Sequence, residues 1–147
     1  MSETRASGFR RARVPALFFV LLVAACGKAK TPTEPVEPVD PTATFTRVQA
    51  EIFTPSCALS GCHAGPSPQQ GMDLSAGRSY GQIVGVKAVE STRPRIAPGD
   101  PASSYLVSKV AGDATITGSR MPLGGPYLSD TTQKLLADWV RRGAPND

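Results

Sequence analysis

The feature that most constrains the fold of this 147-residue chain is a short segment that reads Cys57-Ala-Leu-Ser-Gly-Cys62-His63. It gathers two thiols and the only histidine of the sequence within one stretch. The whole chain is rich in Gly and Pro, with 14 of each, and poor in aromatic residues. Such a chain buries little apolar area through its own side chains, so we expect a large apolar group to complete its core.

Two cysteines followed by a histidine are typical of covalent haem attachment. The thiols add to the vinyl groups of the haem, and the histidine binds the iron as the proximal ligand. The standard spacing is C-x-x-C-H, whereas four residues separate Cys57 and Cys62 here. Because the vinyl positions are fixed, we expect the longer segment to bulge outward through a turn at Ser60-Gly61.

Two other chemistries can use the same residues. A Cys57–Cys62 disulfide is natural in an oxidising compartment and would leave His63 as an ordinary polar residue. A zinc site is less favoured, because structural zinc needs four ligands and only Cys26 remains to join these three.

The first 25 residues have the layout of a signal peptide, with four arginines, an apolar run over 14–23 and small residues before Cys26. That run is too short to span a bilayer permanently, and no other stretch of the sequence approaches the necessary length. Val23-Ala24-Ala25-Cys26 resembles the bacterial lipobox, which implies cleavage before Cys26 and lipidation of its thiol. Ordinary cleavage that leaves Cys26 as a spare thiol is the alternative.

Removal of residues 1–25 lowers the formal net charge from +4 to +1, so the charge does not favour nucleic-acid binding. Residues 26–43 carry a proline at every third position from 32 to 41. This spacing suits a polyproline II spacer between membrane and domain, or a disordered tether of no specific length. Residues 44–147 are long enough for one domain.

Four helices and no period-two strand are predicted in that domain, which makes it all-α. The first covers about 45–56 after an N-cap at Thr44, and the second covers about 75–84 and stops at Gly85. The third starts with Asp100 as cap and Pro101 as first residue and ends at Gly112, and the fourth runs from Ser129 to Gly143. Loops 86–99 and 111–128 are long enough to need a role, and wrapping a cofactor is one.

A second axial ligand of a haem is expected on a loop ahead of the last helix, where Met121 lies. There are 57 residues between His63 and Met121, and Met121 precedes Pro122, which disfavours helix at that position. Met72 follows Cys62 too closely to reach the opposite haem face. Simple core filling is the alternative role for Met121.

Several short motifs in a fixed order carry a family resemblance. They are Cys57-x4-Cys62-His63-Ala64-Gly65, Pro98-Gly99-Asp100-Pro101 with Ser104-Tyr105-Leu106, Arg120-Met121-Pro122, Leu128-Ser129 and the stretch 139–146. Over about residues 45–147 the chain resembles small bacterial cytochrome c-like domains with a C-x4-C-H haem site. The resemblance implies a cytochrome c fold with crossing terminal helices and one covalent haem c on Cys57 and Cys62. His63 and Met121 would then be the axial ligands of the haem iron.

Other residues are candidates for roles around the haem. The second ring N–H of His63 is expected to bond a carbonyl of residues 64–66. Arg95 and Arg120 are candidate partners of the haem propionates, with solvated surface arginines as the alternative. Trp139 is expected in the core and is a candidate contact of the porphyrin edge.

We therefore expect a membrane-anchored monohaem c-type cytochrome in a bacterial cell envelope, facing the periplasm. It would transfer electrons between redox partner proteins at the membrane and would not be an enzyme, with no small-molecule substrate and no nucleic acid. Two alternatives stay open. One is a haem-based sensor or peroxidase-like enzyme in which Met121 is displaced, and the other is a non-haem binding module with a Cys57–Cys62 disulfide.

Overall fold

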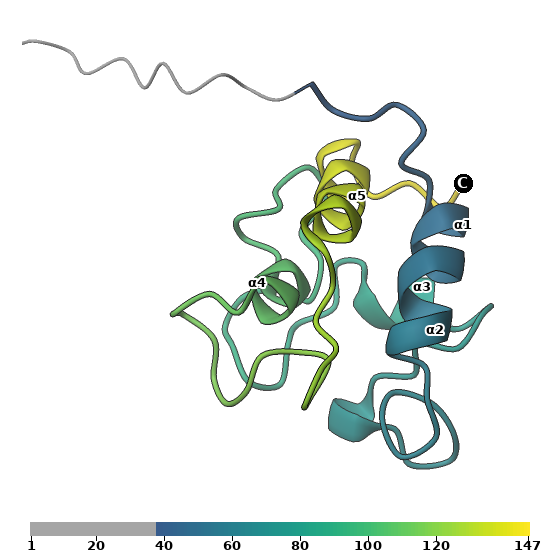
Figure 1. Ribbon diagram of the computed structural model, residues 1–147, viewed down its shortest axis with the longest axis vertical. Coiled ribbons are helices and arrows are strands. Elements are labelled where there is room, and N and C mark those ends of the chain that lie inside the picture. The colour runs from purple at the N-terminus through teal and green to yellow at the C-terminus, as the bar shows by residue number, and fades with distance from the viewer. Residues whose placement is uncertain (1–37) are drawn as a thin grey trace, which may run out of the picture. The chain divides into compact units, whose positions relative to one another are not determined.

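The computed structural model describes residues 38–147, which belong to one compact unit. The predicted signal peptide, Cys26 and most of the predicted tether lie outside the described residues. Within residues 38–147 the chain forms helices joined by long loops, with isolated β-bridges and no sheet (Figure 1). The predicted all-α class is thereby confirmed.

The first helix is continuous and consists of α1 (Phe45–Val48), a π-helical segment (Gln49–Phe53) and α2 (Thr54–Ser56). It begins as predicted, because the hydroxyl of Thr44 accepts a hydrogen bond from the Arg47 amide at 3.2 Å. Pro55 lacks an N–H and its ring crowds the carbonyl four residues earlier, which explains a widened π segment just before it.

The second predicted helix is shorter in the structure, where α3 covers only Ser79–Ile83. The carboxylate of Asp73 accepts a hydrogen bond from the Ser75 amide at 2.9 Å, so the chain first forms a turn there. The end of α3 is as predicted, with Gly85 in the left-handed region at φ +71°.

The third predicted helix begins four residues late, since α4 covers Tyr105–Ala111. Asp100 accepts a hydrogen bond from the Ser103 amide at 3.0 Å, but this closes only an isolated turn. The chain is then extended at Ser104, whose buried hydroxyl accepts from the Ala97 amide at 2.9 Å and donates to the Asp100 carbonyl at 2.8 Å. These bonds hold Ser104 in an extended conformation, which is incompatible with a helix that starts at Pro101.

The last helix, α5 (Asp130–Arg141), matches its prediction. The Ser129 hydroxyl accepts a hydrogen bond from the Thr132 amide at 3.2 Å. Its apolar stripe is buried and α5 packs against both α1 and α4. The ring of Trp139 lies 5.4 Å from that of Phe45, which joins the two ends of the domain.

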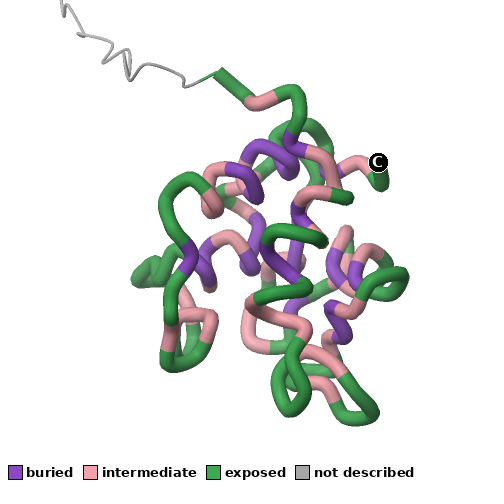
Figure 2. The backbone as a smooth tube through the Cα atoms, turned by 45° about the vertical axis from the view of Figure 1, so that its right-hand side comes forward, coloured by how far each residue is buried: buried purple, intermediate pink, exposed green. Residues whose placement is uncertain are grey.

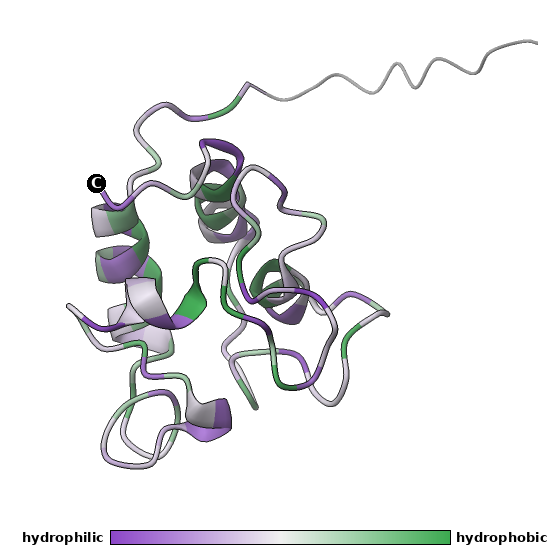
Figure 3. Cartoon of the chain, turned by 180° about the vertical axis from the view of Figure 1, so that it is seen from behind, coloured by the Kyte–Doolittle hydropathy of each residue, from purple (hydrophilic) through white to green (hydrophobic). Residues whose placement is uncertain are grey.

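Buried residues gather between the helices, while much of the loop length is exposed (Figure 2). The helices carry both hydrophobic and hydrophilic residues, and the loops carry short hydrophobic stretches among hydrophilic and neutral residues (Figure 3). The long loops are held by backbone hydrogen bonds and by loop residues of the core such as Leu74 and Ile96.

Residues 38–43, which we assigned to the tether, pack against α5. The amide of Asp40 donates to the Asp138 carboxylate at 3.1 Å, and Lys134 donates to the Pro38 carbonyl at 3.1 Å. Ala43 is fully buried, and its carbonyl accepts from Arg142 at 2.5 Å. In residues 38–147, no helix has the length and apolar character that crossing a bilayer requires.

Candidate functional site

A cavity of about 510 Å³ opens between the first helix, the segment that follows it, α4 and the two long loops. Its volume is in the range of cofactor and ligand sites. Much of its wall is apolar and includes Ile52, Phe53, Leu74, Leu106 and Val110. Cys57, Cys62, His63 and Met121 all line it, as do parts of both long loops.

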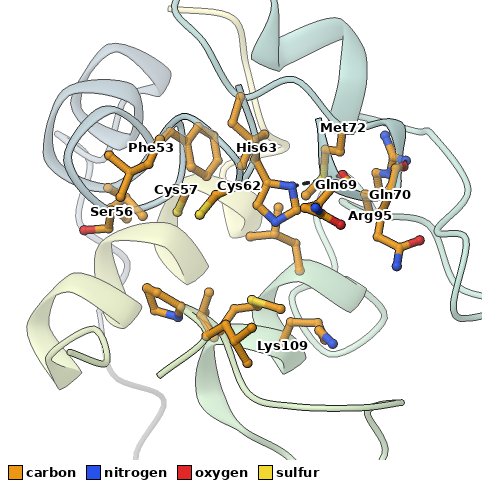
Figure 4. Close-up of a pocket in the computed structure, with 18 of the residues that line it drawn as sticks. Phe53, Ser56, Cys57, Cys62, His63, Gln69, Gln70, Met72, Arg95 and Lys109 are labelled. Atoms are coloured by element: carbon orange, nitrogen blue, oxygen red, sulfur yellow. Dashed lines mark hydrogen bonds between the residues drawn. The ribbon is translucent and has the colours of Figure 1, made fainter. Parts of the chain in front are cut away.

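The cysteine-histidine segment is held by its own backbone. The His63 amide donates to the Cys57 carbonyl at 3.1 Å, and the Cys62 amide donates to the Leu59 carbonyl at 3.0 Å. The second bond closes the predicted turn at Ser60-Gly61, with Gly61 at φ +80°. In Figure 4, Cys57 and Cys62 lie side by side next to His63, on one wall of the cavity.

Both cysteines are free thiols in the structure, Cys57 half-buried and Cys62 exposed. Burial, helped by the charge of Cys62, raises the pKa of the Cys57 thiol to about 11. Cys57 is therefore a protonated thiol at neutral pH and is unsuited to act as a thiolate nucleophile. Among residues 38–147, no three His, Cys, Asp or Glu side chains converge to hold a metal ion, so the zinc hypothesis gains no support.

The ring of His63 is oriented by a hydrogen bond. Its Nδ1 lies 3.1 Å from the carbonyl oxygen of Gln69, and because a carbonyl only accepts, Nδ1 carries the proton. Nε2 of the neutral ring then keeps its lone pair for a metal, and Figure 4 shows the ring directed into the cavity. Burial lowers the pKa of His63, which favours this neutral form.

The predicted acceptor in residues 64–66 was wrong. After that turn the chain returns to the cysteine segment, where the Gln69 amide donates to the Cys62 carbonyl at 2.8 Å. This return brings the Gln69 carbonyl to His63.

Met121 and His63 lie on opposite walls. The Met121 amide donates to the Lys109 carbonyl at 2.9 Å, and Lys109 lies across the cavity from His63 in Figure 4. The structure also brings Met72 to the cavity, but on the His63 side, where its amide donates to the Gln69 carbonyl at 3.1 Å. Met121 is thus bonded to the Lys109 side of the cavity, whereas Met72 lies on the His63 side.

Arg95 is a buried cation on the cavity wall, with 7% of its surface exposed. Its guanidinium donates to the carbonyls of Gln82 and Gln70, each at 2.7 Å. It has no carboxylate partner among residues 38–147. Burial lowers the pKa of Arg95, and a buried cation of this kind is stabilised by an anionic group nearby.

The second cation of the cavity is compensated. Lys109 Nζ lies 3.1 Å from Glu90 Oε2, and both residues line the cavity. Gln70 donates to the other oxygen of Glu90 at 3.2 Å. Sequence reasoning missed this group, because residues so far apart in the chain carry no local signal of their contact.

Arg120 and Trp139 are not among the residues that line the cavity. Arg120 donates through Nε to the Val110 carbonyl at 2.8 Å and stacks over Tyr127. Trp139 is fully buried in the core, and its ring N–H donates to the Pro145 carbonyl at 2.9 Å. Both side chains thus make contacts within the chain, and their contacts with a haem stay predictions.

The chemistry of these walls suits a haem. An apolar cavity has an unprotonated imidazole nitrogen on one wall and a thioether residue on the other, with two thiols beside the imidazole and a buried unpaired cation. Comparison with known proteins adds nothing to this, because no protein family, no curated protein and no solved structure matches the chain.

Proposed function

We propose that this protein is a membrane-anchored monohaem c-type cytochrome with a cytochrome c fold, a carrier of single electrons in the bacterial cell envelope. One observation carries the proposal. The cavity brings the segment Cys57–His63 to one wall and Met121 to the other, although 57 residues separate His63 from Met121.

Each of these residues has a role that its surroundings suit. Cys57 and Cys62 hold the haem through thioether bonds, and the turn at Ser60-Gly61 takes up the two additional residues between them. His63 binds the iron through Nε2, because Nδ1 is engaged by the Gln69 carbonyl. Met121 would supply the second protein ligand to the iron.

The buried cation completes the site. A haem propionate would compensate the guanidinium of Arg95, which has no acidic partner among residues 38–147. A bound haem supplies one reversible electron at its iron. With His63 and Met121 both bound, the iron would have no open position, and this favours outer-sphere transfer to redox partner proteins over chemistry on a small substrate.

The lipid anchor is part of the proposal and depends on Cys26, which lies outside the described residues. Lipidation there would hold the carrier at the membrane surface, facing the periplasm. Cys26→Ser should release the protein from the membrane fraction and leave its haem content unchanged.

Covalent haem is the decisive test. The chain is expressed in a periplasm with a haem-maturation system, and the boiled polypeptide is stained for haem and weighed by mass spectrometry. We expect the mass of one haem on the wild type, and loss of a stable attachment in the Cys57→Ser/Cys62→Ser double variant. A wild-type polypeptide without added haem mass overturns the proposal, and a mobility change on reduction would then indicate the disulfide module.

The axial ligands are tested by paired variants. Met121→Ala should keep the haem but lose the sulfur-to-iron absorption band, whereas Met72→Ala, on the other wall, should keep the band. His63→Ala should abolish the low-spin spectrum, because the chain has no other histidine. A wild type with a five-coordinate, high-spin spectrum would favour the sensor or peroxidase instead.

A further inference from the structure

Arg120 directly precedes Met121, and its guanidinium makes two contacts with other parts of the chain. Its Nε donates to the Val110 carbonyl at 2.8 Å. Its Cζ lies 4.4 Å from the centre of the Tyr127 ring, within the range of a cation–π contact. The side chain thus joins the end of α4 to the chain that follows Met121.

The end of α4 leaves space for the Arg120 side chain. A Cβ on Gly112 would lie only 2.5 Å from Cδ of Arg120, a separation that real contacts do not allow. Gly112 also has φ +76°, which ends the helix in the left-handed region. One glycine therefore both terminates α4 and leaves the space through which Arg120 passes.

The carbonyls involved are those that a helix leaves without partners. The last four carbonyls of a helix have no intrahelical donor, and Lys109 and Val110 belong to the last turn of α4. Arg120 donates to the Val110 carbonyl, and the Met121 amide donates to that of Lys109 at 2.9 Å. Two consecutive residues of the loop are thus fixed to two consecutive residues of the helix.

We infer that Arg120 is a positioning residue that holds Met121 on the cavity wall opposite His63. The inference rests on the proposed function, in which Met121 binds the haem iron. Arg120 does not contact the haem in this account. It acts by lowering the fraction of molecules in which the loop around Met121 has separated from α4.

The test uses the matured holoprotein and external imidazole, which competes with Met121 for the ferric iron. The apparent affinity of such a competitor is proportional to the fraction of molecules in which Met121 is not bound to the iron. Arg120→Gln removes the stacking contact and the Nε bond, whose combined loss corresponds to about a tenfold increase in the open fraction. Imidazole should therefore bind about tenfold more tightly, and the reduction potential should fall.

Two controls separate positioning from charge and from general destabilisation. Arg78→Gln removes the same charge from a side chain that is 73% exposed, and it should leave imidazole affinity unchanged. Tyr127→Phe keeps the ring face and should behave as wild type, while Tyr127→Ala should tighten imidazole binding. Adding Tyr127→Ala to Arg120→Gln should change little, because both remove the same contact.

A second readout does not depend on the iron. Hydrogen exchange of the Met121 amide, which donates to Lys109, should accelerate in Arg120→Gln relative to Arg78→Gln. Unchanged imidazole affinity and unchanged exchange in Arg120→Gln, with a wild type that shows the sulfur-to-iron band, overturn the inference alone. Absence of covalent haem or of that band in the wild type would instead overturn the proposed ligand set.

Discussion

Replacement of Arg95 by leucine perturbs the structure at the point where two loops and the cavity meet. The guanidinium joins the carbonyl of Gln82, on α3, to that of Gln70, in the short 3-10 helix Gln69–Gly71 that follows His63. Gln70 is adjacent to Gln69, the residue that orients the His63 ring. Loss of Arg95 should therefore lower stability and also loosen the support of His63.

The magnitude follows from the two bonds that are lost. Hydrogen bonds that involve a charged group contribute about 1.5–3 kcal/mol each, so two amount to about 3–6 kcal/mol. Part of this is offset, because Arg95→Leu no longer requires desolvation of a cation that is 7% exposed. We expect a net loss of about 3 kcal/mol in the free energy of unfolding. For a domain of this size, that lowers Tm by about 12–24 °C.

The assay is denaturant unfolding of the matured protein, followed by circular dichroism. Arg95→Lys keeps the charge but lacks the fork that spans two carbonyls, so it should fall between wild type and Arg95→Leu. Arg78→Leu, at a mostly exposed arginine, is the matched control and should change stability by less than about 0.5 kcal/mol. The reasoning is refuted if Arg95→Leu costs no more than this control.

Three further changes have defined outcomes. Burial alone would raise the pKa of Asp138, but hydrogen bonds, chiefly from Lys134 and the Asp40 amide, hold that pKa below its ordinary value. The carboxylate therefore stabilises the fold above about pH 4 and loses this effect as pH falls through the lowered pKa. Asp138→Asn should have a lower free energy of unfolding than the wild type at neutral pH, and this difference should shrink as the protein is titrated with acid. Ser129→Ala removes the N-cap of α5 and should cost about 1 kcal/mol in denaturant unfolding. Gly85→Ala, at a residue with positive φ and open space around it, should lower the free energy of unfolding by about 1–2 kcal/mol, the strain of a left-handed backbone. Gly112→Ala has a similar φ and should cost more, because its Cβ would also clash with Arg120. Equal losses in the two variants would contradict that close contact.

The sequence alone determined those features that depend on neighbours in the chain. Thr44 and Ser129 mark helix starts because a cap needs only an amide three residues later. Gly85 and Gly112 mark helix ends because few other residues adopt positive φ. The turn at Ser60-Gly61 was predictable for the same reason.

The tertiary structure decided which residues meet around the cavity. No local pattern predicted that the Lys109 ammonium would pair with Glu90, 19 residues earlier, at the cavity. Likewise, Arg95 became a buried cation and Arg120 a contact of Val110, although both are arginines in Gly- and Pro-rich loops. Such contacts depend on where distant backbone carbonyls come to lie, and packing fixes these positions only when the whole chain has folded.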